Sequence, residues 1–116
     1  MKASEGLNIE QKNDRIWVTL PGSIRRENTT QLTDRIISSL SGSNDQIILD
    51  FTYLLDIYSI TINFILNLRG QIINSGGNIY IVNVSERCRK QLDAVHLELI
   101  LDFFESEEDL PPVINK

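Results

Sequence analysis

The sequence predicts an α/β domain with a mostly parallel sheet, and three consecutive stretches in its middle carry this prediction. Residues 46–51 (QIILDF) have the length and composition of a buried strand. A longer apolar run follows from Tyr58 to Gly76, and residues 78–84 (NIYIVNV) again resemble a strand. A strand, a helical crossover and a second strand form a βαβ unit, in which the two strands pair in parallel.

The middle stretch is open to two interpretations. Residues 59–64 (SITINF) alternate between apolar and polar side chains, which is typical of a strand. Over the wider window, however, the spacing is helical, with one polar member among Ile62, Ile65, Leu66, Arg69, Ile72 and Ile73. The run is too long for a typical strand, and Gly76 suits the left-handed residue that ends many helices. We therefore expect a helix here.

The N-terminal part of the chain predicts a hairpin followed by a helix. Apolar residues alternate on both sides of the turn residues Asn13-Asp14, so one face of the hairpin should be buried, through Leu7, Ile9, Ile16, Val18 and Leu20. Pro21-Gly22 would end the second strand. Asn28 or Thr29 could cap a helix that residues 41–44 (SGSN) end, and its buried stripe would be Leu32, Ile36 and Leu40.

The C-terminal part predicts a third helix, a short strand and a last short helix. Ser85 could cap the third helix, whose apolar stripe would be Cys88, Leu92 and Val95. Residues 99–104 (LILDFF) form a short strand or turn. Ser106 and Asp109 resemble a capping box, and Pro111-Pro112 would end the helix that it opens.

Together these elements predict one domain over residues 1–116, with loose ends at 1–6 and 111–116. It would contain a four- to five-stranded sheet, an N-terminal hairpin and about four helices.

Composition limits the classes of function. Acidic residues outnumber basic ones, 16 against 11, so nucleic-acid binding is not expected. The single Cys88 cannot form an intrachain disulfide, which fits a reducing compartment. No basic and apolar leader opens the sequence, and no apolar run is long enough to span a bilayer. We expect a cytoplasmic protein without direct membrane insertion.

Few residues suggest catalysis. One histidine, His96, and one cysteine, Cys88, cannot build a metal cluster, and no phosphate-binding glycine loop is present. Asp50 and Asp56 flank the end of the central strand without a second catalytic group nearby. The pair Glu107-Glu108 is typical of a solvated helix start. We expect no enzyme activity, no metal and no cofactor.

Ser59 stands at the point where the central strand hands over to the helix, where α/β folds place their sites. Its hydroxyl could simply cap the helix, which stabilises by about 1 kcal/mol. Alternatively it could accept a phosphate, because helix N-termini stabilise anions. From the residues alone the capping role is favoured.

Several of these segments resemble the STAS superfamily and, within it, the bacterial anti-sigma factor antagonists. Residues 20–24 (LPGSI) match the glycine at which the family's second strand ends and its first helix begins. Residues 48–51 (ILDF) match its central strand. Segments 85–95, 97–104 and 106–110 resemble its third helix, last strand and terminal helix. The likeness covers nearly the whole chain.

The resemblance also assigns a role to Ser59, which falls where the family's Asp-Ser-Ser-Gly motif carries its phosphorylated serine. The distance from Ser59 to Gly76-Gly77 fits the family's spacing to its paired glycines. The motif itself departs, with Tyr58 for the aspartate, Ile60 for the second serine and Thr61 for the glycine.

The resemblance implies a non-enzymatic regulatory module that binds an anti-sigma factor or a serine-protein kinase and is switched by phosphorylation of Ser59. The partner surface would include Tyr58, Ser59, Ile60 and Thr61. Arg25 and Arg26 would lie beside it, or form an ordinary solvated loop. The alternative is a STAS scaffold that is never phosphorylated, in a signalling assembly or a lipid-transport complex, because Tyr58 and Ile60 make the motif apolar.

Overall fold

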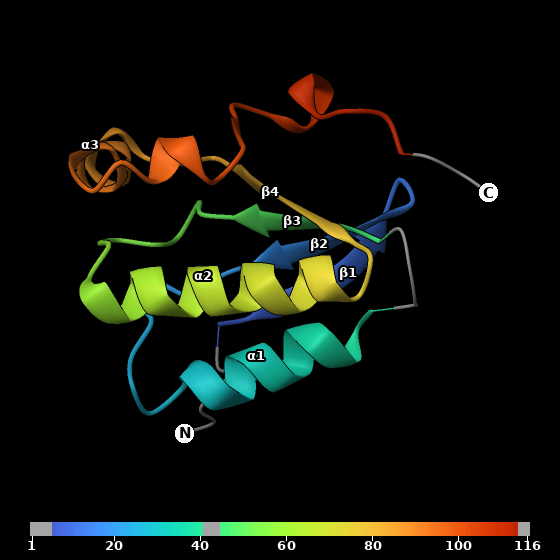
Figure 1. Cartoon of the computed structure of the whole chain (residues 1–116), viewed down its shortest axis with the longest axis horizontal. Coiled ribbons are helices and arrows are strands. Elements are labelled where there is room, and N and C mark those ends of the chain that lie inside the picture. The colour runs from blue at the N-terminus through green and yellow to red at the C-terminus, as the bar shows by residue number, and fades with distance from the viewer. Residues whose placement is uncertain (1–5, 41–44, 114–116) are drawn as a thin grey trace.

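A computed structural model describes residues 6–40 and 45–113 of the chain, which form a five-stranded sheet with helices packed against it (Figure 1). The strands are β1 Asn8–Lys12, β2 Arg15–Thr19, β3 Gln46–Asp50, β4 Asn78–Val82 and β5 Phe103–Phe104. The α-helices are α1 Thr29–Ser38, α2 Ser59–Asn74 and α3 Glu86–Ala94, and two 3₁₀ turns are η1 Leu97–Leu99 and η2 Glu107–Asp109.

The order of the strands across the sheet is the same as their order in the sequence, β1-β2-β3-β4-β5. β1 and β2 are antiparallel, and the other three pairs are parallel. The predicted class and the hairpin are confirmed, whereas the count of about four helices is corrected to three α-helices within the described residues.

The hairpin turn confirms the role expected of Asn13-Asp14. Both residues have positive φ, 54° and 64°, and Lys12 pairs with Arg15 across them. Two-residue hairpin loops of this hand match the twist of the flanking strands, and Asn and Asp tolerate the left-handed region.

The predicted βαβ unit is present as β3, α2 and β4, with Ser59 in a helix and not in a strand. At its end Gly76 has a φ of 87°, and the N–H of Gly77 donates to the carbonyl oxygen of Ile72 at 3.0 Å. The buried stripe of α2 differs from the expected one, since Ile73 is exposed and the buried residues are Thr61, Phe64, Ile65, Leu68 and Ile72.

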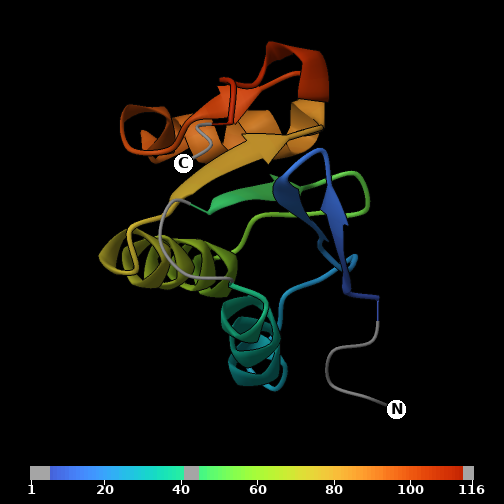
Figure 2. The ribbon, with the colours of Figure 1, turned by 90° about the vertical axis from the view of Figure 1, so that its right-hand side faces the viewer.

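Both faces of the sheet are covered, which corrects the expectation of a single buried hairpin face. The larger core lies between the helices and residues such as Val18, Ile47 and Leu49. On the opposite face Trp17 is buried against a second cluster that contains Ile48, Val82 and Leu110. Figures 1 and 2 show α1 and α2 side by side along one face, away from the C-terminal segment. The C-terminal segment, through Leu110, therefore covers the face of the sheet opposite α1 and α2.

Side-chain bonds hold the C-terminal segment against the sheet. The carbonyl oxygen of Pro111 accepts hydrogen bonds from Arg15 and Gln46. Glu107, expected to be solvated, forms ion pairs with Lys12 and Arg15. The predicted capping box is absent, because the Ser106 hydroxyl donates to the Asp109 carboxylate and the helix is a single 3₁₀ turn.

The starts and ends of α1 and α3 follow the prediction in part. Asn28 is the N-cap residue of α1, but its side chain accepts from the N–H of Arg25 and not from the helix. Ser85 caps α3, and Cys88 and Leu92 are buried, whereas Val95 is exposed beyond the helix end. Residues 41–44, expected to end α1, lie outside the described residues.

Candidate functional site: the start of helix α2

The carboxyl ends of β2 and β3 bring two loops together. The N–H of Leu55 donates to the carbonyl oxygen of Gly22 at 3.1 Å, so the β3–α2 loop is bonded to the β2–α1 loop. Adjacent parallel strands put their carboxyl ends at one edge of the sheet, where α/β folds place their sites. The start of α2 is presented at this edge.

Tyr58, and not Ser59, occupies the N-cap position of α2. Tyr58 has an extended backbone, with φ −108° and ψ 173°, and Ser59 is the first helical residue. Ser59 is exposed, and its hydroxyl forms no hydrogen bond with the described residues. The interpretation of Ser59 as a helix cap is therefore wrong by one residue, and its hydroxyl is left available for other chemistry.

Thr61 does the capping that the sequence suggested for Ser59. Its side chain is fully buried, and its hydroxyl oxygen accepts the N–H of Tyr58 at 3.2 Å. The expectation that Thr61 belongs to a partner surface is corrected for this reason. Its burial had a sequence signal, because Thr61 lies four residues before Ile65 and seven before Leu68, which are both buried.

Asp50 anchors the start of the β3–α2 loop. It is nearly buried, and its carboxylate accepts hydrogen bonds from the indole N–H of Trp17 at 3.0 Å, from Thr52 and from the amide of Asn83 at 3.1 Å. Burial raises the pKa of Asp50, but the hydrogen bonds from Thr52, Asn83 and Trp17 outweigh it and hold the pKa below its ordinary value. The group is structural, since its acceptor atoms are already occupied.

Asp56 joins the end of the same loop to α3. Its carboxylate contacts Nε of Arg87 at 2.7 Å and accepts a hydrogen bond from Gln91 at 3.2 Å. The hydrogen bond from Arg87 is the main cause that lowers the pKa of Asp56. The side-chain oxygen of Gln91 also accepts the N–H of Ile57 at 2.8 Å. The loop conformation is therefore fixed from both ends.

The two predicted arginines are in the loop that the Gly22–Leu55 bond brings to this edge. Arg25 and Arg26 are exposed, and Nε of Arg25 lies 4.0 Å from Glu27. Among the described residues, no ion pair or hydrogen bond joins either guanidinium to Ser59.

An apolar surface beside Ser59 combines Tyr58, which the sequence analysis assigned to the partner surface, with two residues that it missed. Tyr53, Leu55 and Tyr58 are 63%, 68% and 59% exposed, and all three belong to the β3–α2 loop. We refer to these three residues as the apolar loop surface. For Tyr53 and Leu55 the sequence signal was that apolar side chains persist after the buried strand has ended. Three large exposed apolar side chains within six residues of one loop indicate a protein-binding surface.

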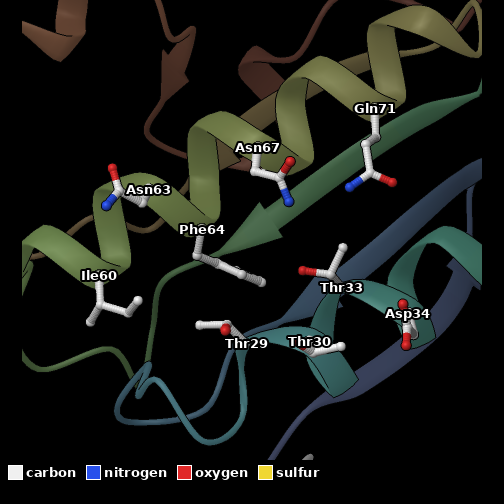
Figure 3. Close-up of a pocket in the computed structure, with 9 residues that line it drawn as sticks. All are labelled: Thr29, Thr30, Thr33, Asp34, Ile60, Asn63, Phe64, Asn67 and Gln71. Carbon is white, nitrogen blue, oxygen red and sulfur yellow. The ribbon is translucent and has the colours of Figure 1, made fainter.

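A groove of about 400 Å³ lies between α1 and α2 (Figure 3). Phe64 forms its buried floor, and Ile60 stands at the end near Ser59. The remaining lining is polar and comes from both helices, as Thr29, Thr30, Thr33, Asp34, Asn63, Asn67 and Gln71.

The described residues offer no site for a metal, since no three His, Cys, Asp or Glu side chains gather there. None of the helices within 6–40 and 45–113 combines the length and apolar character that a membrane crossing requires.

The described residues form a small α/β domain in which the start of α2 is exposed at one edge of the sheet. The chain belongs to the STAS domain family, whose model matches residues 7–110. A search of curated proteins finds no significant match.

Solved structures share the fold at low sequence identity. A protein from Thermotoga maritima, provisionally identified as an anti-sigma factor antagonist, is 21% identical with a TM-score of 0.74 over 92% of both chains. An anti-sigma factor antagonist from Mycobacterium paratuberculosis is 14% identical, with a TM-score of 0.74 over 89% of this chain and 87% of that one. A murine anion transporter of solute carrier family 26 has a TM-score of 0.69 at 17% identity, with 86% of this chain and 17% of the transporter covered.

Proposed function

We propose that this chain is a non-enzymatic regulatory module of the anti-sigma factor antagonist type. It binds an anti-sigma factor or a serine-protein kinase through the start of α2, and phosphorylation of Ser59 switches the binding. The observation that carries the proposal is the free, exposed hydroxyl of Ser59 at the first position of α2.

The geometry supports a switch in two ways. A phosphate on Ser59 would sit where the unpaired N–H groups and dipole of the helix favour an anion. It would also place a charge of about −1.5 to −2 beside the apolar loop surface. A partner that buries Tyr58 or Leu55 would then have to desolvate that charge, so phosphorylation would weaken the complex.

The acidic neighbour of the family motif has no substitute here. Tyr58 stands in its place, and Asp56, the nearest carboxylate in sequence, is held by Arg87 and Gln91. We therefore expect slow phosphorylation of the native chain and faster phosphorylation of Tyr58→Asp.

The test uses any anti-sigma factor or kinase-like ATPase that is found encoded beside this gene. Binding is measured by titration calorimetry with the full chain, Ser59→Ala, Ser59→Asp and the control Ser75→Asp. Ser75 is exposed at the other end of α2, roughly 24 Å along the helix. We expect Ser59→Asp to weaken binding about tenfold, or ~1.4 kcal/mol, while Ser59→Ala and Ser75→Asp stay within about twofold of the native chain.

Incubation with the kinase and ATP, followed by mass spectrometry, tests the acceptor. Phosphate on Ser59 supports the switch. An unmodified chain whose binding is also unchanged by Ser59→Asp would overturn it.

That outcome would leave the second candidate, a STAS scaffold with a permanent interface. The observation in its favour is the apolar loop surface, since obligate interfaces are more apolar than transient ones. Transporter permease and ATPase genes beside this one would support a scaffold in a lipid-transport complex. We further propose that the module acts in the cytoplasm and turns over no nucleotide. ATP hydrolysis that survives stringent purification and is lost in Ser59→Ala would contradict the second statement.

A further inference from the structure

We infer that the groove between α1 and α2 binds an extended peptide segment of the partner and recognises its main chain. The inference rests on the proposed docking function for the location of that segment. Its own evidence is the set of side chains that line the groove.

The side-chain amides of α2 form a regular row. Asn63, Asn67 and Gln71 recur every four residues and line the groove; in Figure 3 the amides of Asn67 and Gln71 are turned toward α1, and that of Asn63 is turned away from it. Among residues 6–40 and 45–113, none of these three amides forms a hydrogen bond. A side-chain amide both donates and accepts, as a peptide group does. Asn67 and Gln71 therefore offer two unpaired partners for a peptide main chain, and the exposed Asn63 can supply a third when its side chain rotates.

The spacing of the row matches an extended chain. Four residues of α-helix rise about 6 Å. Two residues of an extended strand rise about 6.6 Å, and the peptide groups on one edge of a strand repeat at this interval. Over three amides the two repeats drift apart by only about 1 Å, which side-chain rotation absorbs. Each amide can thus meet every second residue of a strand that lies along α2.

The opposite wall and the ends of the groove add direction. Thr30 and Thr33 of α1 face the row, and Phe64 gives an apolar floor. Asp34 lies toward the end marked by Gln71, so a basic side chain fits there. The other end opens at Ile60, next to Ser59, so a partner docked on the apolar loop surface can continue into the groove.

The test uses a displayed library of random nine-residue peptides, selected on the full chain. The enriched peptides are synthesised, and their dissociation constants are measured by fluorescence anisotropy. We expect Asn67→Leu to weaken binding about tenfold. The matched control is Asn74→Leu, an exposed residue at the end of α2 that does not line the groove, and it should stay within about twofold. Circular dichroism and urea unfolding check that both variants fold.

Main-chain recognition has its own signature. Neighbouring peptide groups of a strand face opposite edges, and only one edge meets the amides. N-methylation of every second peptide group should therefore weaken binding strongly when the methylated groups face α2, and little when they face away from it. Asp34→Asn should lower the affinity for peptides that carry a basic residue near one end.

Three results would overturn the inference: no enriched peptide, binding unaffected by Asn67→Leu, or affinity that changes with N-methylation of neither set of alternate peptide groups. The groove and the proposed switch fail separately. Loss of peptide binding with phosphate still placed on Ser59 removes the groove alone, and peptide binding without any phosphorylation removes the switch alone.

Discussion

Helices α2 and α3 both begin at the carboxyl edge of the sheet and both begin beside a serine, but the two hydroxyls differ in what they contact. At α3, Ser85 is the N-cap residue, and its hydroxyl oxygen accepts the N–H of Cys88 at 3.1 Å. At α2, Ser59 lies one position later, and the capping bond runs from Tyr58 to the buried Thr61. A shift of one residue thus separates a serine that caps a helix from one whose hydroxyl forms no hydrogen bond with the described residues.

The two helix starts also differ in the groups that hold the preceding loop. The β3–α2 loop depends on two carboxylates, Asp50 at its beginning and Asp56 at its end. The turn before α3 contains Asn83, whose amide donates to the same Asp50. Substitutions at the two helix starts, taken from the largest expected effect to the smallest, test how far the starts of α2 and α3 are independent.

The largest effect is expected for Asp50→Ala. The substitution removes the acceptor of Trp17, Thr52 and Asn83 at once and leaves the indole N–H of Trp17 buried without a partner. We expect a loss of about 2–3 kcal/mol in the free energy of unfolding. Urea unfolding followed by the fluorescence of Trp17, the only tryptophan, measures it. An unchanged midpoint would show that the carboxylate does not anchor the loop.

The same carboxylate makes the stability depend on pH. The pKa of Asp50 in the folded chain is below the unfolded value of about 3.9. Its stabilising contribution is therefore complete above that value and is lost as the pH falls through the folded-state pKa. As the pH falls from about 5 to about 2, the free energy of unfolding of the native chain should decrease more than that of Asp50→Asn. Equal slopes for the two chains would contradict the direction of the pKa shift.

Thr61→Val should have an intermediate effect. Valine keeps the buried volume but removes the acceptor of the Tyr58 N–H. We expect a cost of about 1–2 kcal/mol, measured by thermal or urea unfolding. Thr61→Ser, which keeps the hydroxyl, is the control and should recover part of the loss.

The smallest effects come from the two serines as a matched pair. Ser85→Ala should cost about 1 kcal/mol, because it deletes the cap of α3. Ser59→Ala should change the free energy of unfolding by less than about 0.5 kcal/mol, because no bond of its hydroxyl is lost. A larger loss for Ser59→Ala than for Ser85→Ala would reverse the comparison.

The sequence predicted the fold where local patterns and long-range packing agree. Alternation around Asn13-Asp14 identified the hairpin, and the run from Tyr58 to Gly76 identified the βαβ unit. The second core was missed, because Leu110 covers Trp17 from a segment more than ninety residues away, and no local pattern records that contact. The same reason explains why Pro111 was expected to be loose.

The candidate site was predictable in position but not in detail. The resemblance placed Ser59 at the right helix, yet the choice between cap and first residue depends on one residue of register. The exposure of Tyr53 and Leu55 depends on a loop that Asp56, Arg87 and Gln91 hold in place from a different helix. Such contacts arise only in the folded chain.

The strand order has a consequence for synthesis on the ribosome. Because the strands lie side by side in the order of the chain, each emerging strand pairs with the one made just before it, and none has to insert between earlier strands. Domains fold during synthesis from the N-terminus onward. The face around Trp17 and Ile48 nevertheless stays open until Leu110 has left the exit tunnel. Until then the apolar side chains of this face are exposed to aggregation and to chaperones.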